Sequence, residues 1–358
     1  MSDNELLVEI QDLRVEFFVR SGIIKAVDGV SFEIRRGQTL GVIGESGCGK
    51  SITARAILQM IPKPGKITNG QVMYHRQAKG STQTDLINIS KLDPDGRTIR
   101  EIRGGEIGMI FQEPMSSLTP VYTAGVHIDE ALSLHHLTAF RKVGDQLAES
   151  IQAHQKLSKE DARQMSIDLL RRVGIPKPDQ RVDSYPHQLS GGQRQRVMIA
   201  IALSCQPAML IADEPTTALD VSIEAQILDI MREMQENANM AIMFITHNLG
   251  VIAEMAEEIV VMYMGKQVER AKTVDLFYEA KHPYTRALLQ SIPKVGKKTG
   301  LRLASIEGMV PDPFHLPPGC VFHPRCPSFM PGRCDKIAPT WKQIVGDHWA
   351  SCLLYEEE

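Results

Sequence analysis

The stretch of sequence that decides the fold lies at residues 44–51 and reads Gly44-Glu45-Ser46-Gly47-Cys48-Gly49-Lys50-Ser51. It follows a short apolar run at 39–43, which predicts a buried strand, and it opens a stretch with helical periodicity at 51–60. In this strand–turn–helix context, the spacing G-x-x-x-x-G-K-S predicts a phosphate-binding loop, whose backbone N–H groups and helix N-terminus face phosphate oxygens. We therefore expect Lys50 to reach the β- and γ-phosphates of a nucleotide and the Ser51 hydroxyl to ligate Mg²⁺. Cys48 is expected to be only a small residue of the loop.

The composition indicates a globular chain with a sizeable core. At roughly 150 residues per domain, the 358 residues suggest two domains, and 43% of them are hydrophobic. Lysine and arginine number 40 against 43 aspartates and glutamates, so the net charge of −3 supplies no basic field for nucleic acid. No apolar run reaches the roughly 20 residues that span a bilayer, and the acidic first residues lack the features of a signal peptide. We therefore expect a cytoplasmic chain that reaches a membrane only through a partner.

Strands and helices are predicted to alternate along the chain. Alternating apolar residues predict strands at 6–10, 13–17 and 30–34, with turns at Gly22 and Gly37. Apolar runs predict further strands at 107–111, 209–212, 241–246 and 259–262, and helical periodicity marks 157–174 and 221–238. This alternation predicts an α/β fold with a mostly parallel sheet covered on both faces.

A mainly helical subdomain is predicted at about 115–187, inserted between two core strands. Within it, residues 125–135 resemble residues 144–154, because a glycine, a glutamate and a histidine recur and most apolar positions match. We interpret the pair as a small tandem duplication that adds one helix near 124–142, the alternative being chance similarity between two amphipathic helices.

Two adjacent carboxylates, Asp213 and Glu214, end the apolar run at 209–212. Carboxylates are expensive to bury, so a pair at the end of a buried strand implies a cation or a reaction. We predict that Asp213 holds Mg²⁺, directly or through water, and that Glu214 polarises an attacking water as general base. The alternative is that one of the two caps the following turn.

A third motif, Leu189-Ser190-Gly191-Gly192-Gln193, stands between the phosphate loop and the carboxylates. Alone it is a helix cap with a flexible turn, but in this position it resembles the signature of the ATP-binding-cassette family. The other motifs of that family match in order: Gln112 resembles the Q-loop glutamine, Ala218-Leu219-Asp220 the D-loop, His247 the switch histidine, and Phe17 (or Phe18) the aromatic residue that stacks on adenine.

The resemblance covers residues 6 to about 290 and implies a fold and a division of the chain. The fold is an α/β P-loop NTPase of the cassette type, with a RecA-like core, an antiparallel β subdomain and the inserted helical subdomain. The cassette is assigned to residues 1–290, a linker rich in Pro, Lys and Gly to 291–319, and a small cysteine-rich extension to 320–358.

The resemblance also implies how the motifs act. Two cassettes dimerise head to tail around two ATP molecules, each held between the phosphate loop of one subunit and the Ser-Gly-Gly-Gln turn of the other. Hydrolysis opens this dimer and moves membrane subunits through the groove beside Gln112. The catalytic residues are Lys50, Gln112, Glu214 and His247, and the Mg²⁺ ligands are Ser51, Gln112 and Asp213. The residues expected to contact nucleotide are Phe17, Gly44, Glu45, Ser46, Gly47, Cys48, Gly49, Lys50, Ser51, Ile52, Ser190, Gly191, Gly192, Gln193 and Asp220.

Four of the six cysteines crowd the C-terminal extension: Cys320, Cys326, Cys334 and Cys352. Disulfides are not expected in a cytoplasmic chain, so the crowding predicts a metal or cluster site. The spacing lacks the C-x2-C pairs of most zinc sites and favours a [4Fe–4S] cluster over Zn²⁺, with unliganded structural thiols as the remaining alternative. Either metal would staple a Pro-rich tail that is too small to form its own core.

Three other polar side chains of the extension have open roles. His323 and His348 are alternative metal ligands, although their surroundings also suit plain packing. Arg325 is expected to satisfy a neighbouring sulfur or carboxylate.

Two C-terminal segments indicate which cassette this is. The segments, His282-Pro283-Tyr284-Thr285-Arg286-Ala287-Leu288-Leu289 and Pro318-Gly319-Cys320-Val321-Phe322-His323-Pro324-Arg325-Cys326-Pro327, resemble those of oligopeptide, dipeptide and nickel importer ATPases. The four cysteines make the likeness strongest to the peptide importers. The resemblance thus implies an ATPase that energises import of di- or oligopeptides; the alternatives are the same role for nickel or another small solute, and a soluble non-transport cassette.

The same resemblance implies a set of partners. They are a second ATPase subunit in a heterodimer, two permease subunits and an extracytoplasmic peptide-binding protein, with no nucleic acid. The expected location is peripheral, on the cytoplasmic face of the inner membrane.

Overall fold

A computed structural model describes residues 5–77, 84–111, 141–155, 157–217, 219–291 and 306–356. By its internal contacts the chain divides into two compact units. Unit 1 comprises Met1–Glu5, Arg36–Gln38 and Leu92–Met243, and unit 2 comprises Leu6–Arg35, Thr39–Lys91 and Phe244–Glu358. The boundary between them falls within strand β8 (Ala241–Ile245).

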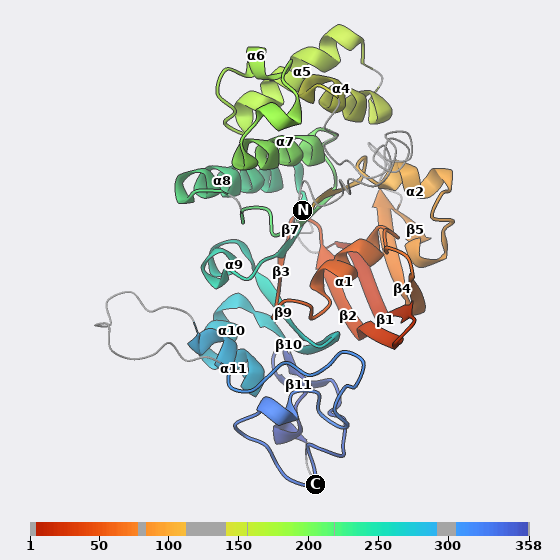
Figure 1. Ribbon diagram of the computed structural model, residues 1–358, viewed down its shortest axis with the longest axis vertical. Helices are drawn as coiled ribbons and strands as arrows, with labels where there is room; N and C mark the ends of the chain where they lie inside the picture. The colour runs from red at the N-terminus through yellow and green to blue at the C-terminus, as the bar shows by residue number, and fades with distance from the viewer. Residues whose placement is uncertain are drawn as a thin grey trace, which may run out of the picture. The chain divides into compact units, whose positions relative to one another are not determined.

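Unit 2 begins with a four-stranded antiparallel sheet in the order β2-β1-β4-β5 (Figure 1). Its strands are β1 (Leu6–Val19), β2 (Gly22–Arg35), β4 (Gly65–Gln77) and β5 (Thr84–Asn88), followed by the 3₁₀ turn η1 (Ile89–Lys91). The sequence predicted two strands where the structure has the single strand β1, so that prediction was wrong. Asp12, with a φ of 43°, forms an irregularity that shifts the pairing between Ile10 and Leu13 without ending the strand.

The second sheet of unit 2 joins the phosphate-loop strand to the tail. Its strands are β3 (Thr39–Ile43), β9 (Glu258–Tyr263), β10 (Lys266–Lys272), β12 (His348–Ala350) and β11 (Lys342–Val345), in that spatial order. β3 and β9 pair in parallel, whereas each of the later pairs is antiparallel. The β9–β10 hairpin leaves the outer edge of β10 open, and β12 of the tail pairs with that edge. The tail therefore extends a sheet of the cassette.

Unit 2 also contains helices and two short 3₁₀ turns. They are α1 (Lys50–Ile57), α9 (Leu249–Met255), α10 (Thr273–Glu279) and α11 (Pro283–Gln290), with the short turns η3 (His323–Arg325) and η4 (Leu353–Tyr355).

Unit 1 combines a short parallel strand pair with a group of helices. Strands β6 (Ile107–Ile110) and β7 (Met209–Asp213) are buried along their whole length, as expected for strands covered on both faces. The helices are α2 (Arg97–Ile102), α4 (Val143–His154), α5 (Lys159–Arg172), α6 (Pro178–Arg181), α7 (Gly191–Leu203) and α8 (Val221–Ala238), with the 3₁₀ turn η2 (Pro186–Gln188). Helices α4, α5 and α7 pack on one another through buried residues such as Leu147, Leu170 and Val197.

Most of the predicted elements are confirmed. The four later strands, the helix predicted at 157–174 and the helix predicted at 221–238 agree with the structure to within about two residues at each end. The second copy of the apparent repeat, at 144–154, lies in α4. The extra helix near 124–142 falls almost wholly outside the described residues, and so do residues 292–305 of the predicted linker.

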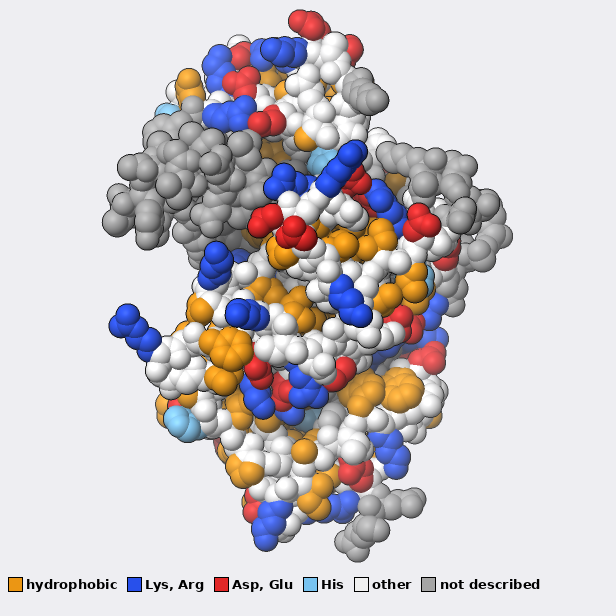
Figure 2. All heavy atoms as spheres, turned by 90° about the vertical axis from the view of Figure 1, so that its right-hand side faces the viewer, with side chains coloured by type: hydrophobic (Ala, Val, Ile, Leu, Met, Phe, Trp, Pro, Cys, Tyr) orange, Lys and Arg blue, Asp and Glu red, His pale blue; other side chains and the backbone are white. Residues whose placement is uncertain are grey.

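The surface carries charge of both signs. On the face shown in Figure 2, basic and acidic side chains are interspersed rather than gathered by sign. Within the described part of the chain, no helix combines the length and the apolarity needed to cross a membrane.

Candidate nucleotide-binding site

The phosphate-binding loop is built by β3, α1 and two glycines that no other residue could replace. A Cβ on Gly44 would lie 2.2 Å from the carbonyl oxygen of Met262 in β9, and Gly44 has a φ of 150°. A Cβ on Gly49, whose φ is 101°, would lie 2.3 Å from the carbonyl oxygen of Ala26 in β2. Close packing of neighbouring strands and positive φ angles therefore require glycine at both ends of the turn.

Lys50 places a buried positive charge inside this loop. Its side chain is 7% exposed, and Nζ donates to the carbonyl oxygens of Gly44 at 2.7 Å and Glu45 at 2.9 Å. Nζ also lies 3.6 Å from Cys48 Sγ. Burial raises the pKa of the Cys48 thiol, although the neighbouring Lys50 opposes this shift, so the thiol is neutral and acts as a small loop residue.

The two carboxylates of unit 1 have different surroundings. Asp213 ends β7 and is 1% exposed, whereas Glu214 stands one residue further on with a φ of 50°, in the left-handed region that residues other than glycine rarely adopt. Thr217 Oγ1 donates to the Glu214 carbonyl at 3.2 Å and lies 3.1 Å from Glu214 Oε2. Gln195 Nε2, on the buried face of α7, donates to the carbonyls of Glu214 and Pro215. These contacts hold Glu214 in its strained conformation.

The sequence analysis predicted a catalytic role for Glu214 but did not single out Gln195 and Thr217, two residues that contact it. A glutamine in the middle of a helix is the weak signal that could have pointed to Gln195, since a polar side chain that is 1% exposed needs a partner. Its partners lie about twenty positions further along the chain, and helical spacing says nothing about them.

The Ser-Gly-Gly-Gln turn forms the N-terminus of α7. Ser190 Oγ accepts the N–H of Gln193 at 3.3 Å, and Gln193 Oε1 accepts the N–H of Ser190 at 3.2 Å, which is a reciprocal capping box. No described atom lies within 4 Å of the position that a Cβ on Gly191 would take. Packing within the described residues thus gives no reason for glycine at that position.

Three more predicted residues lie at the starts of helices or on the antiparallel sheet. Asp220 caps α8 by accepting the N–H of Ile223 at 3.0 Å. His247 is exposed at the end of β8, just before Asn248, which caps α9. Phe17 is half-buried on β1, and its ring lies against Gly65 of β4, where an added Cβ would come within 2.8 Å of the ring.

The predicted site residues are divided between the two units. Unit 2 contains Phe17, Phe18, the phosphate loop and His247, and unit 1 contains the two carboxylates, the Ser-Gly-Gly-Gln turn and Asp220. Gln112 and Ala218 lie outside the described residues.

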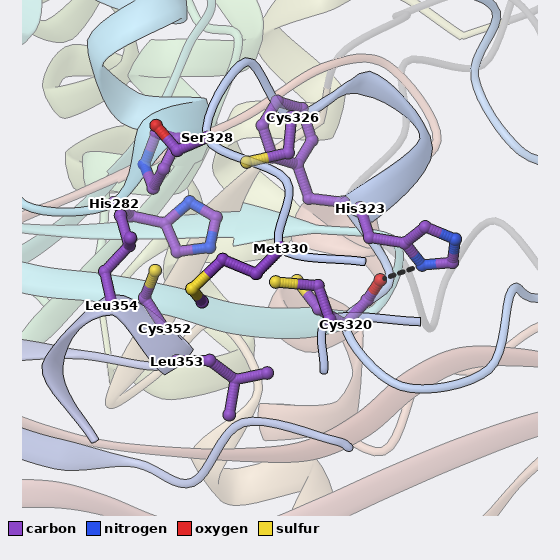
Figure 3. Close-up of a pocket in the computed structure, with 12 residues that line it drawn as sticks. His282, Cys320, His323, Cys326, Ser328, Met330, Cys352, Leu353 and Leu354 are labelled. Carbon is purple, nitrogen blue, oxygen red and sulfur yellow. Dashed lines mark hydrogen bonds between the residues drawn. The ribbon is translucent and has the colours of Figure 1, made fainter. Parts of the chain in front are cut away.

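The four cysteines of the tail line a single pocket together with His282 and His323 (Figure 3). All four are free thiols. Burial raises the pKa values of Cys320, Cys326 and Cys352, and that of Cys352 rises to about 11. Across the described ranges, no group of three or more His, Cys, Asp or Glu side chains is arranged to hold a metal ion.

The two tail histidines have different partners. His323 lines the pocket, and its Nδ1 donates to the carbonyl of Cys320 at 2.9 Å. His348 lies outside that lining; its Nε2 donates to Glu269 at 2.6 Å, and both side chains are almost fully buried. His348 is therefore held by a buried hydrogen bond to Glu269 of β10, which suits a structural role.

Arg325 binds a carboxylate, as the sequence predicted. Its guanidinium donates to both carboxylate oxygens of Glu45, at 2.7 and 3.0 Å. The sequence did not reveal that this carboxylate belongs to the phosphate-binding loop.

His282 should make unit 2 sensitive to acid. It is 1% exposed and caps α11 by accepting the N–H of Tyr284 at 3.1 Å, and burial lowers its pKa from 6.5 to about 4. Between these pH values the His282 imidazole binds a proton more readily in the unfolded chain than in the folded one. The free energy of unfolding therefore falls as the pH is lowered from 6.5 to 4, by at most about 3 kcal/mol.

The variant His282→Asn keeps a side-chain acceptor that can cap α11 and removes the group that titrates. Urea denaturation between pH 7 and 5 should show a flatter pH dependence for this variant than for the wild type and the exposed-site control His187→Asn; equal slopes would refute the assignment.

The fold and these motifs define the class of protein, which is an ATP-binding cassette. Residues 27–217 match the ABC transporter family, and residues 268–334 match the oligopeptide/dipeptide transporter C-terminal region. The chain is 41% identical to the dipeptide transport ATP-binding protein DppD of Bacillus subtilis, over 99% of this chain and 96% of that protein. It is 43% identical to the oligopeptide transport ATP-binding protein AppD of the same organism, over 98% of each chain.

Solved structures agree on the fold. The dimeric post-hydrolysis state of the ATP-binding cassette MJ0796, bound to ADP and Pi, has a TM-score of 0.61 and 24% identity, over 75% of this chain and 99% of that one. This chain belongs to the ABC transporter family and, within it, to the dipeptide and oligopeptide transport ATP-binding proteins. It is an ATPase of the cassette type.

Proposed function

We propose that this chain is the ATP-hydrolysing subunit that energises the import of di- or oligopeptides through a membrane ABC transporter. The observation that carries the proposal is the match along almost the whole chain, tail included, to proteins named for dipeptide and oligopeptide transport. The substrate enters the proposal through those names, because cargo selection in such a transporter belongs to other subunits.

The proposed partners are a second cassette, two permease subunits and an extracytoplasmic peptide-binding protein, at the cytoplasmic face of the inner membrane. No atom of the described residues lies within 4 Å of a Cβ added at Gly191, which supports a head-to-tail heterodimer, because such a glycine suits the close approach of a phosphate held by another subunit. No nucleic-acid partner is proposed, because the net charge of −3 supplies no overall basic field.

The proposed mechanism assigns each motif a role in phosphoryl transfer to water. Lys50 binds the β- and γ-phosphates, and Glu214 accepts a proton from the water that attacks the γ-phosphorus as the bond to ADP breaks. His247 and Gln112 are proposed to lie next to the γ-phosphate of the bound ATP. In this proposal Asp213, a carboxylate that is 1% exposed at the end of a strand, is a ligand of the catalytic cation, and Ser51 and Gln112 are the other two ligands. Mg²⁺ there would neutralise charge that develops on the phosphates.

We further propose that the four tail cysteines hold a metal, with a [4Fe–4S] cluster favoured over Zn²⁺. Four free thiols from separate segments of a short tail line one pocket, and this donor set suits either metal. Binding would deprotonate the thiols and draw them into a ligand group, which stabilises a tail with little core of its own. Iron, acid-labile sulfide and zinc are to be measured on protein purified without oxygen. Iron together with sulfide would support the cluster, and zinc alone would support the zinc site. If neither metal is found, the cysteines are unliganded structural thiols.

Peptide uptake tests the transport proposal. Cells that carry the wild type or Glu214→Gln are given labelled di- and oligopeptides, with nickel in parallel. We expect peptide uptake to collapse in the variant while nickel uptake is unchanged. Normal peptide uptake together with lost nickel uptake would establish the nickel alternative. If neither uptake changes, only the assignment as an ATPase remains.

A further inference from the structure

The peptide unit of Glu45, the second residue of the phosphate-binding loop, is held by two residues of the C-terminal region. Its N–H donates to Tyr284 Oη at 2.8 Å, and its two carboxylate oxygens accept from Nη1 and Nη2 of Arg325. Its carbonyl accepts Lys50 Nζ at 2.9 Å and the N–H of Cys48 at 3.3 Å. Every polar group of Glu45 is therefore occupied, and two of its four partners, Tyr284 and Arg325, lie beyond residue 280.

The ion pair rests on a buried aromatic cluster formed by Tyr263, Tyr284 and Phe322. The three rings lie 4.7–5.4 Å apart between centroids, and each is at most 1% exposed. The Arg325 guanidinium carbon lies 5.9 Å from the centroid of the Tyr263 ring, and the Arg325 side chain is only 4% exposed. A charge in such surroundings is weakly screened, so the loss of either partner leaves an uncompensated charge.

The sign of the charge on Glu45 matters because the loop binds a polyanion. A carboxylate in a phosphate-binding loop repels the phosphates unless a cation pairs with it. We propose that Arg325 is a positioning residue of the ATP site, which holds the Glu45 carboxylate paired and directed toward the tail. The cysteine-rich tail is then part of the nucleotide-binding machinery as well as an extension of the sheet.

The tail determines where Arg325 lies. Arg325 ends the turn η3, between Cys320 and Cys326, and both of these cysteines line the tail pocket. The turn is held by the N–H of His323 donating to the Cys320 carbonyl at 3.0 Å and by the N–H of Cys326 donating to the His323 carbonyl at 3.2 Å. Arg325 therefore links the segment that carries two of the pocket cysteines to the phosphate loop.

The test is a double-mutant cycle on the purified full-length chain, with MgATP and MgADP binding measured by calorimetry. Arg325→Met keeps most of the side-chain volume and removes the charge, and Glu45→Gln removes the carboxylate at constant shape. Arg333→Met is the matched control, because Arg333 lies in the same tail and donates to the Glu356 carbonyl. Arg325→Lys keeps the charge without the two-pronged contact and serves if Arg325→Met folds poorly.

We expect Arg325→Met to weaken MgATP binding roughly tenfold, and MgADP binding less, because the unpaired carboxylate repels the more highly charged nucleotide. The weakening should shrink as salt rises. Glu45→Gln should tighten MgATP binding about threefold, since Arg325 then keeps its full charge, and in that background Arg325→Met should weaken binding no more than about threefold. Arg325→Lys should weaken it less than Arg325→Met.

Three results would overturn the inference. The first is that Arg325→Met binds MgATP with wild-type affinity. The second is that Arg325→Met loses the same affinity whether or not Glu45→Gln is present. The third is that the control Arg333→Met loses as much affinity as Arg325→Met. The inference rests on the proposed ATP site. If the wild type does not bind MgATP, both the inference and the proposed site are overturned. If the wild type binds MgATP and Arg325→Met binds it equally well, only the inference is overturned.

Discussion

Glu214→Gln is expected to lower ATP hydrolysis at saturating MgATP by about 10²–10⁴-fold, the range for loss of a positioned general base. Glutamine keeps the shape of the side chain and can still accept from Thr217 Oγ1, which lies 3.1 Å from Glu214 Oε2, so the strained turn should persist. What is lost is the capacity to take a proton from the attacking water. MgATP binding should survive, because Glu214 acts on the water rather than on the phosphates.

The measurement is steady-state phosphate release by the assembled transporter, with nucleotide binding measured in parallel. Glu279→Gln is the matched control, since Glu279 forms an exposed surface pair with Lys281. Turnover close to that of wild type in Glu214→Gln would remove Glu214 from the catalytic role, and equal losses in both variants would point to a general effect of the substitution.

Lys50→Met is expected to weaken MgATP binding by about 10- to 100-fold, because hydrogen bonds to charged groups contribute roughly 1.5–3 kcal/mol each. Hydrolysis should fall further, since the same ammonium stabilises charge that develops on the phosphates. Methionine preserves the buried stem of the side chain but leaves the carbonyls of Gly44 and Glu45 without their shared donor. Some loosening of the loop should therefore accompany the loss of charge.

Calorimetric titration with MgATP checks this prediction, with Lys66→Met as control, because Lys66 is an exposed lysine on β4. Unaltered affinity in Lys50→Met would place the phosphates elsewhere. These two variants separate nucleotide binding from hydrolysis: Lys50→Met should impair both, and Glu214→Gln should impair hydrolysis only.

Local sequence patterns predicted most of the fold and most of the candidate site. The strand, turn and helix around the phosphate loop, the capping box at Ser190 and the carboxylate pair after β7 each depend on neighbours within a few positions. Such patterns report conformational preferences and periodicity, which act over short stretches of chain. The same limit explains the error in β1, where Asp12 with its turn-like φ remains inside a paired strand.

The roles of buried polar residues could not be read in this way. Gln195 and Thr217 position Glu214, and Glu269 joins β10 to His348 and to the N-terminus of α11. Each pairing depends on which elements are brought together, and hydrophobic periodicity is silent on that choice.

Short motifs are enough to predict a phosphate loop, a pair of carboxylates, a signature turn and four clustered thiols. Contacts between residues far apart in the chain depend on the tertiary structure. Arg325 and Glu45 stand 280 positions apart, and they meet because the tail adds strands to the sheet that carries the phosphate loop. Burial makes the loss of either partner costly, because an ionised side chain that is removed from water needs a counter-charge close to it.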